Sequence, residues 1–193
     1  NNFGVVFHPN RLYHNSGDGS FTRVNMPGLT DTLAPFTVPS WNDYDQDGDM
    51  DLFIGTGPGG SAAVDCLYKN MLKETGTATL IRLNLPPLTT DLVDGQIWNL
   101  IDYDNDGDLD AFLTNYASSI PNNLYKNNNG TYEKMTEAQV GSIVSDLGLF
   151  LTNLWGDFNN DGFIDCFVTR QGGPASYYNN NGNGTFTRID STP

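Results

Sequence analysis

The sequence repeats one acidic motif three times, first as Asp43-Tyr-Asp-Gln-Asp-Gly-Asp-Met-Asp51. The motif returns as Asp102-Tyr-Asp-Asn-Asp-Gly-Asp-Leu-Asp110 and again as Asp157-Phe-Asn-Asn-Asp-Gly-Phe-Ile-Asp165. The first aspartates of the three copies lie 59 and 55 residues apart. A nearly constant period of this size indicates a repeat architecture, in which each copy forms one supersecondary unit.

Two further motifs recur in register with the acidic one. The first reads Leu12-Tyr-His-Asn15, Leu67-Tyr-Lys-Asn70, Leu124-Tyr-Lys-Asn127 and, more loosely, Tyr177-Tyr-Asn-Asn180. The second follows it as Gly19-Ser-Phe-Thr-Arg-Val24, Gly130-Thr-Tyr-Glu-Lys-Met135 and Gly184-Thr-Phe-Thr-Arg-Ile189, with Gly76-Thr-Ala-Thr-Leu-Ile81 as a degenerate copy. Because the order never changes, the chain holds three full repeats, preceded by a copy that has only the later motifs.

Each full repeat predicts four short β-strands and no long helix. Apolar, β-branched and aromatic runs of four to six residues are separated by clusters of Gly, Asn, Asp and Pro. This alternation is typical of strands and turns. In the second full repeat, strands are expected near 96–101, 109–114, 123–126 and 131–135.

We therefore expect an all-β fold, a single β-propeller-type domain over residues 1–193 built from blades of four antiparallel strands. Three full blades are expected at 31–85, 86–140 and 141–193, after a partial blade at 1–30. A sandwich fits less well, because its strands do not recur as a sequence unit. Three and a half units do not easily close a ring, so the partial blade is expected to present an unpaired sheet edge.

The tryptophans and cysteines are expected in the core. Trp41, Trp98 and Trp155 precede the first Asp of their motif by two, four and two residues. Even offsets place all three on one face of the first strand. Cys66 and Cys166 occupy different places in the repeat, which favours two buried thiols over a disulfide.

The acidic motif predicts an oxygen cage for a hard cation. Positions 1, 3, 5 and 9 offer side-chain oxygens, position 7 can offer its backbone carbonyl, and Gly at position 6 permits a tight left-handed turn. Oxygen ligands in a flexible loop favour calcium over zinc, copper or magnesium. Three Ca²⁺ sites are expected, with these ligands: Asp43, Asp45, Asp47, Asp49 and Asp51; Asp102, Asp104, Asp106, Asp108 and Asp110; Asp157, Asn159, Asp161, Phe163 and Asp165.

Two alternatives explain the motif less well. Asp-rich turns that need no ion would crowd several carboxylates together without a cation to offset their repulsion. An EF-hand has a bidentate Glu at position 12 and flanking helices. Here position 12 is Ile54, Leu113 or Val168, each in a segment typical of a strand.

Composition limits the partners. The chain has 9 Lys and Arg against 23 Asp and Glu, a formal net charge of −14. Nucleic acid and anionic membrane surfaces are therefore not expected as partners. No run of 18 apolar residues and no basic leader followed by an apolar stretch occurs, so we expect no membrane insertion and a mature form without a signal peptide.

The motifs resemble the FG-GAP/VCBS repeats of integrin-α-like propellers, and especially the bacterial and cartilage-acidic-protein-like variants. The likeness rests on the Leu-Tyr-x-Asn, Gly-Thr-Phe and Asp-Tyr-Asp-x-Asp-Gly-Asp-x-Asp elements quoted above and covers nearly the whole chain. It implies a secreted or cell-surface calcium-binding propeller used for adhesion, recognition or assembly. The short length, the degenerate copy at 76–81 and the N-terminal copy without a loop depart from the family's pattern.

Several functions stay open. We expect a non-enzymatic extracellular module that adheres or self-assembles into an oligomer or filament, with the chain itself, another protein or a glycan as partner. A carbohydrate-binding propeller, with Tyr116, Tyr177 or Tyr178 stacking on sugars, is one alternative. An accessory part of a polysaccharide-degrading enzyme is another. Asn129 and Asn183 begin N-x-T sequons on predicted turns, which glycosylation and plain Asn-Gly turn chemistry both explain.

Overall fold

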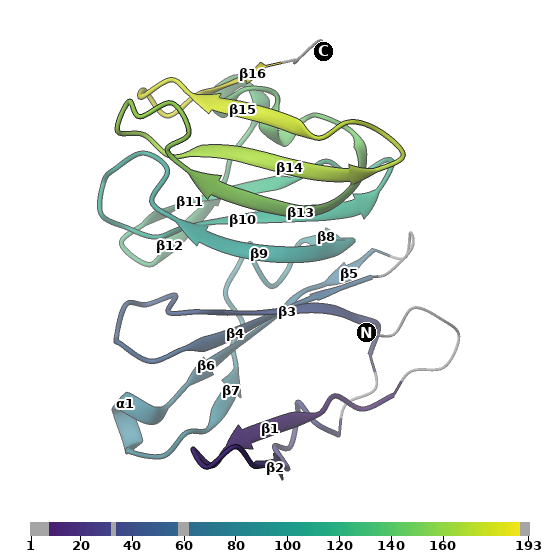
Figure 1. The fold of residues 1–193 in the computed structure, drawn as a ribbon, viewed down its shortest axis with the longest axis vertical. Helices are drawn as coiled ribbons and strands as arrows, with labels where there is room; N and C mark the ends of the chain where they lie inside the picture. Colours follow the sequence, from purple (N-terminus) through teal and green to yellow (C-terminus); the bar gives the residue numbers. More distant parts are fainter. Residues whose placement is uncertain (1–7, 32–33, 58–61, 190–193) are drawn as a thin grey trace.

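Antiparallel β-strands are the main secondary structure (Figure 1). The computed structural model describes residues 8–31, 34–57 and 62–189, so the two ends of the expected domain lie outside the described residues. The main strands fall into four units in chain order. Unit 1 has β1 (Leu12–Asn15) and β2 (Phe21–Val24); unit 2 has β3 (Phe36–Asn42), β4 (Asp51–Thr56), β6 (Cys66–Asn70) and β7 (Leu80–Arg82). Unit 3 has β9 (Gly95–Ile101), β10 (Asp110–Ala117), β11 (Asn123–Asn128) and β12 (Thr131–Lys134); unit 4 has β13 (Gly148–Gly156), β14 (Asp165–Gln171), β15 (Ser176–Asn180) and β16 (Phe186–Ile189).

Short elements link the units. The two-residue strands β5 (Ala63–Val64) and β8 (Leu92–Val93) pair with each other. A single helical turn, α1 (Leu72–Thr75), lies between β6 and β7, and α2 (Glu137–Val140) leads into the 3₁₀ turn Ser142–Val144 before unit 4. None of these helices is long and apolar enough to cross a bilayer, a finding that covers the described residues.

Strands pair in chain order within units 2, 3 and 4. The strands expected within residues 96–135 are present as β9 to β12, with ends that differ by at most three residues from the expected positions. Tyr116 and Ala117 at the end of β10 also pair with Leu149 and Gly148 of β13, which joins units 3 and 4 into one sheet. Sequence periodicity gave no sign of this pairing, because it depends on how two units meet.

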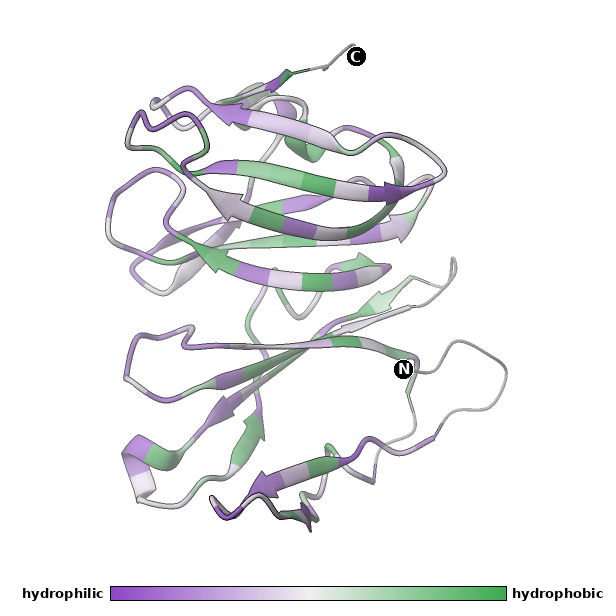
Figure 2. Ribbon diagram, in the orientation of Figure 1, coloured by the Kyte–Doolittle hydropathy of each residue, from purple (hydrophilic) through white to green (hydrophobic). Residues whose placement is uncertain are grey.

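The units lie one after another along the long axis of the molecule, and the core fills the spaces between them (Figure 1). Separate clusters of buried side chains lie between units 1 and 2, units 2 and 3, and units 3 and 4. Every residue of β4 and nearly every residue of β10 is buried, because both faces of these strands are covered. Apolar residues accordingly run along the strands, and polar residues gather in the turns (Figure 2). The arrangement is propeller-like.

The tryptophans do not all reach the core as expected. Trp98 is 1% exposed, and its ring lies 5.5 Å from that of Phe53 in the preceding unit. Trp155 is partly buried, with its ring 5.2 Å from that of Phe112 in the preceding unit. Trp41 is 45% exposed, so the prediction of a core position is wrong for it. Its preceding unit is the β1–β2 hairpin, which has no strand equivalent to β4 or β10 among the described residues.

The prediction of two buried thiols is confirmed. Cys66 and Cys166 are both buried and neither forms a disulfide. Cys66 contributes to the cluster between units 1 and 2, and Cys166 to the cluster between units 3 and 4. Burial raises the pKa of both thiols, so they act as small apolar side chains rather than nucleophiles.

Candidate metal centres

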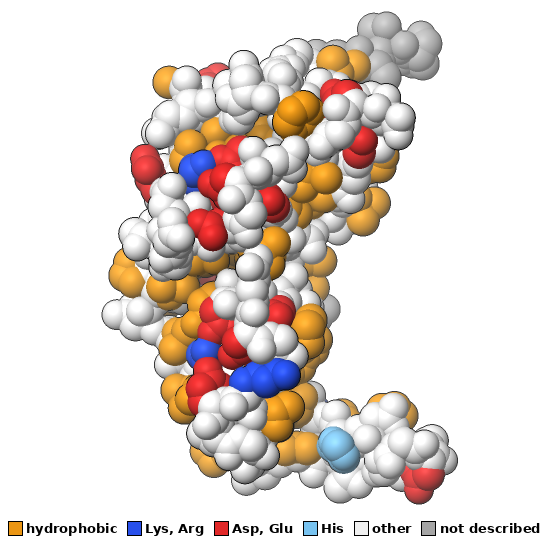
Figure 3. Space-filling model, turned by 90° about the vertical axis from the view of Figure 1, so that its left-hand side faces the viewer, with side chains coloured by type: hydrophobic (Ala, Val, Ile, Leu, Met, Phe, Trp, Pro, Cys, Tyr) orange, Lys and Arg blue, Asp and Glu red, His pale blue; other side chains and the backbone are white. Residues whose placement is uncertain are grey.

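The three acidic motifs form the turns that join the first two strands of units 2, 3 and 4, and all three turns lie at the same side of the molecule (Figure 1). We call them loop 1 (residues 43–51), loop 2 (residues 102–110) and loop 3 (residues 157–165). In the space-filling view of this side, acidic side chains gather in patches with basic side chains among them (Figure 3). The repeat therefore places equivalent acidic turns side by side on one surface.

The Asp at position 1 closes each turn from inside. In loop 2, the Asp102 carboxylate accepts hydrogen bonds from the N–H groups of Asp106 and Gly107, each at 3.0 Å. The Asp43 and Asp157 carboxylates accept the same two bonds in their loops. The chain can bend this sharply because positions 4 and 6 adopt left-handed conformations, with φ of 59° at Asn105 and 93° at Gly107. The sequence indicated the glycine but not position 4, which is Gln46, Asn105 or Asn160.

The Asp at position 9 links each loop to the third strand of its unit. Asp110 is fully buried, and its carboxylate accepts the N–H of Tyr103 at 3.2 Å and that of Asn127 at 2.7 Å. Asp51 and Asp165 accept the corresponding bonds from Asn70 and Asn180, each at 2.8 Å. Burial raises the pKa of Asp110 to about 7 and that of Asp51 to about 6. A cation bound beside them would offset this cost of burying charge.

Carboxylates from positions 1, 3 and 9 converge in loops 1 and 2. The oxygens of Asp43, Asp45 and Asp51 lie within 4.8 Å of one another, and so do those of Asp102, Asp104 and Asp110. One oxygen of Asp104, Oδ1, is buried without a hydrogen-bond donor among the described residues. Oxygen donors around a buried, unsatisfied carboxylate oxygen fit a hard cation such as Ca²⁺.

Loop 3 differs from the other two loops. Position 3 is Asn159, whose side-chain N–H₂ donates to Asp161 at 2.8 Å and to Asn179 at 2.8 Å. Because position 3 is an amide, it gives the loop no carboxylate, and its N–H₂ group points toward position 5. The Asp165 carboxylate additionally accepts the Tyr177 hydroxyl at 2.7 Å. Loop 3 therefore has the predicted turn and a less acidic set of donors than loops 1 and 2.

The residue at position 7 was expected to offer its backbone carbonyl to the cation. In loops 1 and 2 this residue is an Asp, and its side chain accepts a hydrogen bond from outside the loop. The Asp49 carboxylate accepts the N–H of Lys73 at 2.9 Å, and the Asp108 carboxylate accepts the N–H of Asn129 at 2.7 Å. Both bonds run to the connection between the third and fourth strands. These aspartates thus link the loop to the outer part of its unit.

Two lysines that the sequence interpretation did not include reach the loops from the third strand. The Lys69 ammonium contacts Asp45, Asp47 and Glu74, and the Lys126 ammonium contacts Asp104 and Asp106. Hydrogen bonds to Asp45 and to Asp104 raise the pKa of these lysines, so both stay charged. Unit 4 has Asn179 in this slot, opposite Asn159 instead of an Asp. The in-register Leu-Tyr-Lys-Asn motif was the signal that could have revealed the pairing.

The remaining sequence candidates are placed as follows. Tyr178 is fully buried, with its hydroxyl on Asp146 at 2.6 Å, so it cannot stack on a sugar. Tyr116 is partly buried and bonds Gln171. Asn129 and Asn183 are exposed, and Asn183 accepts the N–H of Thr185 at 3.1 Å in an Asx turn. A cavity of about 350 Å³ lies between loop 1 and unit 3, with Tyr44 and Tyr132 in its lining.

Comparison with known proteins agrees with this repeat. A family model described as FG-GAP-like repeat matches residues 3–54 and 157–193, segments that include loops 1 and 3. A search of curated proteins found no match. The matched segments, the recurring acidic turn and the propeller-like packing of the strands agree, so residues 3–54 and 157–193 are similar to FG-GAP-like repeats.

Proposed function

We propose that the chain is a calcium-stabilised β-propeller module, built from three four-stranded blades and a partial blade, in a secreted or cell-surface protein. In this proposal it has no catalytic activity and acts in adhesion or in self-assembly into an oligomer or filament. Its partner is a second protein surface, its own surface or a glycan. FG-GAP-like repeats are typical of extracellular proteins, which supports the location.

One observation carries the calcium assignment: carboxylates converge in loops 1 and 2, in turns of the same geometry. The ligands would be the side chains of positions 1, 3, 5 and 9, together with the carbonyl of position 7. A bound cation supplies charge compensation and no bond-breaking chemistry in this role. Three divalent ions would offset 6 of the 14 formal negative charges. Extracellular calcium modules bind with Kd on the order of 10⁻⁴ to 10⁻³ M.

The hydrogen bonds that the acidic residues make favour a binding role over catalysis. Asp102 and Asp110 each accept two backbone N–H groups, which hold a turn to a strand. The two lysines nearest the loops are paired with loop carboxylates. These residues have a structural purpose that requires no substrate.

The cavity beside loop 1 favours the carbohydrate-binding alternative. It combines an aromatic wall, Tyr44 and Tyr132, with the acidic and amide groups of Asp45, Asp108 and Asn129. Such a combination can stack on a sugar ring and hydrogen-bond its hydroxyls. Screening on a glycan array in calcium, with Tyr44→Ala as the paired variant, distinguishes this function: a glycan that binds the natural chain and is lost in the variant would establish it.

Sedimentation velocity and thermal unfolding of the chain in millimolar Ca²⁺ and in EGTA test the main proposal. Calcium is expected to raise the melting temperature, by a stabilisation of about 1.4 kcal/mol per site at tenfold excess over Kd. It is also expected to produce a compact species that associates. Identical unfolding in the two buffers would overturn the calcium assignment, and a compact monomer at all concentrations would overturn self-assembly.

A further inference from the structure

Loops 2 and 3 are joined by two side-chain hydrogen bonds that cross the boundary between units 3 and 4. Asn180 is 1% exposed, and its side-chain N–H₂ donates to the carbonyl of Tyr103, position 2 of loop 2, at 2.8 Å. Asn105, position 4 of loop 2, donates its side-chain N–H₂ to the carbonyl of Gly162, position 6 of loop 3, at 3.3 Å. We call Asn180 and Asn105 the bridging asparagines, because each connects one loop to the unit of the other.

We propose that the bridging asparagines are positioning residues that couple cation binding in loops 2 and 3, so that a cation bound in one loop strengthens binding in the other. Loop 1 binds its cation independently of both. This inference rests on the proposed function, because it requires that the loops bind calcium. It adds to that function a division of the three loops into one coupled pair and one separate site.

Asn180 contacts an expected ligand of loop 3 and a peptide group next to an expected ligand of loop 2. Its backbone N–H donates to the Asp165 carboxylate, position 9 of loop 3, at 2.8 Å. The carbonyl that its side chain holds belongs to the peptide group that joins Tyr103 to Asp104, position 3 of loop 2. The N–H of Tyr103 donates at 3.2 Å to Asp110, position 9 of the same loop. A continuous chain of hydrogen bonds and peptide groups therefore links the position 9 carboxylates of the two loops.

The Asn105 bond reaches the ligand-bearing part of loop 3. The carbonyl that it holds belongs to the peptide group that joins Gly162 to Phe163, and the carbonyl of Phe163 is an expected ligand. The N–H of the same peptide group donates to the Asp161 carboxylate, position 5 of loop 3, at 2.9 Å. Asn105 thus orients a peptide group that an expected ligand of the neighbouring loop also holds.

A cation that orders one of these loops lowers the cost of ordering the other. Binding fixes the liganding carboxylates of a loop, together with the peptide groups bonded to them, and fixing these groups costs conformational entropy. Because the bridging asparagines hold peptide groups of both loops, the first cation has already covered part of this cost. The second cation then binds more tightly, and thermodynamic linkage requires the same factor in both directions.

The counterparts of the bridging asparagines face a cavity at the boundary between units 2 and 3. Gln46 is position 4 of loop 1, and Asn127 ends the Leu-Tyr-Lys-Asn motif of unit 3; both line the cavity of about 350 Å³ beside loop 1. The side-chain N–H₂ of Asn127 reaches the Tyr132 hydroxyl at 3.4 Å, whereas unit 4 has Phe186, which has no hydroxyl, at this place. Among the described residues, no hydrogen bond joins loop 1 to loop 2.

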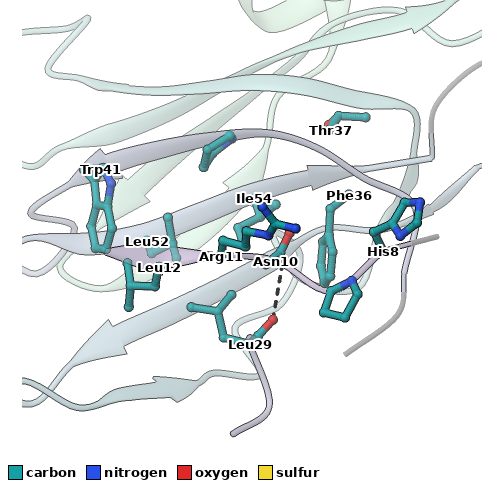
Figure 4. A pocket seen from close by; sticks show the side chains of 12 residues that line it. His8, Asn10, Arg11, Leu12, Leu29, Phe36, Thr37, Trp41, Leu52 and Ile54 are labelled. Carbon is teal, nitrogen blue, oxygen red and sulfur yellow. Dashed lines mark hydrogen bonds between the residues drawn. The ribbon is translucent and has the colours of Figure 1, made fainter. Parts of the chain in front are cut away.

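The boundary on the other side of unit 2 does not connect loop 1 to a loop either. An apolar cavity of about 520 Å³ lies there between units 1 and 2, and its lining includes Leu12, Trp41 and Leu52 (Figure 4). No described residue of this lining belongs to an acidic loop. The cation affinity of loop 1 should therefore not depend on whether loops 2 and 3 are occupied.

The glycines at position 6 provide a separate signal for each loop. The amide N–H groups of Gly48, Gly107 and Gly162 each donate to the position 1 carboxylate of their own loop. ¹H–¹⁵N NMR of the full 193-residue chain during titration with CaCl₂ therefore gives a Kd for each loop. The titration is made at about 0.15 M ionic strength, which screens repulsion between two bound cations beyond about 8 Å.

Asp104→Ala removes loop 2 as a cation site. Asp104 supplies one of the converging carboxylates of this loop and pairs with a lysine rather than with the backbone of the turn. In this variant the Kd of loop 3, followed at Gly162, should rise by about fivefold or more. Asp45→Ala makes the same change at position 3 of loop 1 and is the matched control, which should leave the Kd of loop 3 unchanged.

The comparison is then repeated in chains that lack the bond from Asn180. Asn180→Ala keeps its backbone N–H and removes the side-chain donor, so the effect of Asp104→Ala on the Kd of loop 3 should be lost. Asn127→Ala is the matched control, because Asn127 makes the corresponding contacts within its own unit and no bond to another loop. In that background the effect of Asp104→Ala should persist.

Asn105→Gly gives the same test without a substitution in the core. Asn105 is exposed, and glycine adopts its left-handed φ of 59° without strain, so this variant is expected to fold like the natural chain. Gln46→Gly makes the equivalent change in loop 1, where φ is 56°. The effect of Asp104→Ala on the Kd of loop 3 should shrink in Asn105→Gly and stay unchanged in Gln46→Gly.

The outcomes separate this inference from the proposed function. Equal loop 3 affinity in the natural chain and in Asp104→Ala, or tighter binding in the variant, overturns the coupling and leaves the calcium assignment standing. An effect that persists in both Asn180→Ala and Asn105→Gly overturns the role of the bridging asparagines. Glycine signals that do not respond to calcium overturn the calcium assignment and the coupling with it.

Discussion

Asp102 has two tasks in loop 2, because its carboxylate both closes the turn and faces the carboxylates of Asp104 and Asp110. Asp102→Ala is therefore expected to abolish calcium binding at loop 2, to leave loops 1 and 3 binding, and to destabilise the calcium-free chain by about 1 to 3 kcal/mol. Calorimetric titration with calcium measures the first effect and urea unfolding the second. Glu133→Gln, an exposed change on β12, is the control and should alter neither.

Lys126 provides a second test at the same loop. Its ammonium contacts Asp104 and Asp106, two expected calcium ligands, so it repels an incoming cation. Lys126→Met should raise the calcium affinity of loop 2 by about tenfold and lower the stability of the calcium-free chain. Lys134→Met removes an ammonium that pairs with Asp91 outside the loops, and should leave calcium affinity unchanged. Weaker calcium binding in Lys126→Met would contradict this role.

Asp65 gives a pH dependence that is separate from the loops. Its buried carboxylate accepts the Thr56 N–H at 2.8 Å and the Trp98 indole N–H at 2.7 Å, and burial raises its pKa from 3.8 to about 7. A carboxyl whose pKa is higher in the folded than in the unfolded state stabilises the fold at low pH. That contribution is lost as pH rises from about 4 to about 7.

Asp65→Asn removes this titration, and unit 3 naturally has Asn122 at the corresponding position, with its oxygen on the N–H of Asn115 at 3.1 Å. The difference in unfolding free energy, natural chain minus variant, should fall by on the order of 2 to 4 kcal/mol between pH 4 and pH 7 and stay flat above. Urea unfolding of both proteins at constant saturating calcium measures it. A difference that rises with pH would contradict the assignment.

Sequence spacing predicted the acidic turns and the convergence of positions 1, 3 and 9 in loops 1 and 2, because the residues of one turn stay together when the chain folds. It did not predict Lys69 and Lys126, which reach the loops from the third strand, 24 and 22 residues beyond Asp45 and Asp104. It also missed the left-handed position 4, where Gln46 carries no signal comparable to glycine. The sequence therefore did not predict the long-range ion pairs of the loops or the left-handed backbone conformation at position 4.

At the scale of strands, the buried Trp98 and the partly exposed Trp41 should contribute very different amounts to the free energy of unfolding. Trp98 is buried between units 2 and 3, so Trp98→Ala should cost about 3 to 5 kcal/mol of unfolding free energy. Trp41 lies at the cavity beside unit 1 and is partly exposed, so Trp41→Ala should cost about 1 kcal/mol or less. Urea unfolding of both variants in calcium measures the costs. Equal costs would show that Trp41 is covered in solution.

The strands themselves were largely predictable, since apolar runs of strand length end at Gly, Asn and Asp in each repeat. The elements that escaped prediction are set by contacts between units. The pairing of β10 with β13 joins two repeats, and β5 with β8 joins residues on either side of a repeat boundary. The turns α1 and α2 have four residues each, too few for a helical period to be visible. The core prediction failed for Trp41 because Trp41 and Trp155 both precede the first Asp of their motif by two residues, but the units that precede them differ.

At the scale of the whole molecule, the proposed self-assembly is expected to depend on charge. The acidic loops lie on one side of the chain, and the net charge is −14, so calcium is expected to reduce repulsion between copies as well as within each copy (Figure 3). Among the described residues, the β1–β2 hairpin of unit 1 pairs with no further strand, so we expect it to present a sheet edge for pairing. Association should therefore depend on calcium more strongly than on ionic strength alone, which sedimentation in calcium and in matched sodium chloride compares.

The most direct test of the central claim is a count of bound calcium by equilibrium dialysis of the natural chain and of Asp102→Ala. The three-loop proposal predicts about three ions per natural chain, and about two per variant, at saturating calcium and in the presence of excess magnesium. Three ions in both proteins would place calcium outside loop 2. A natural chain that binds none would contradict the calcium assignment as a whole.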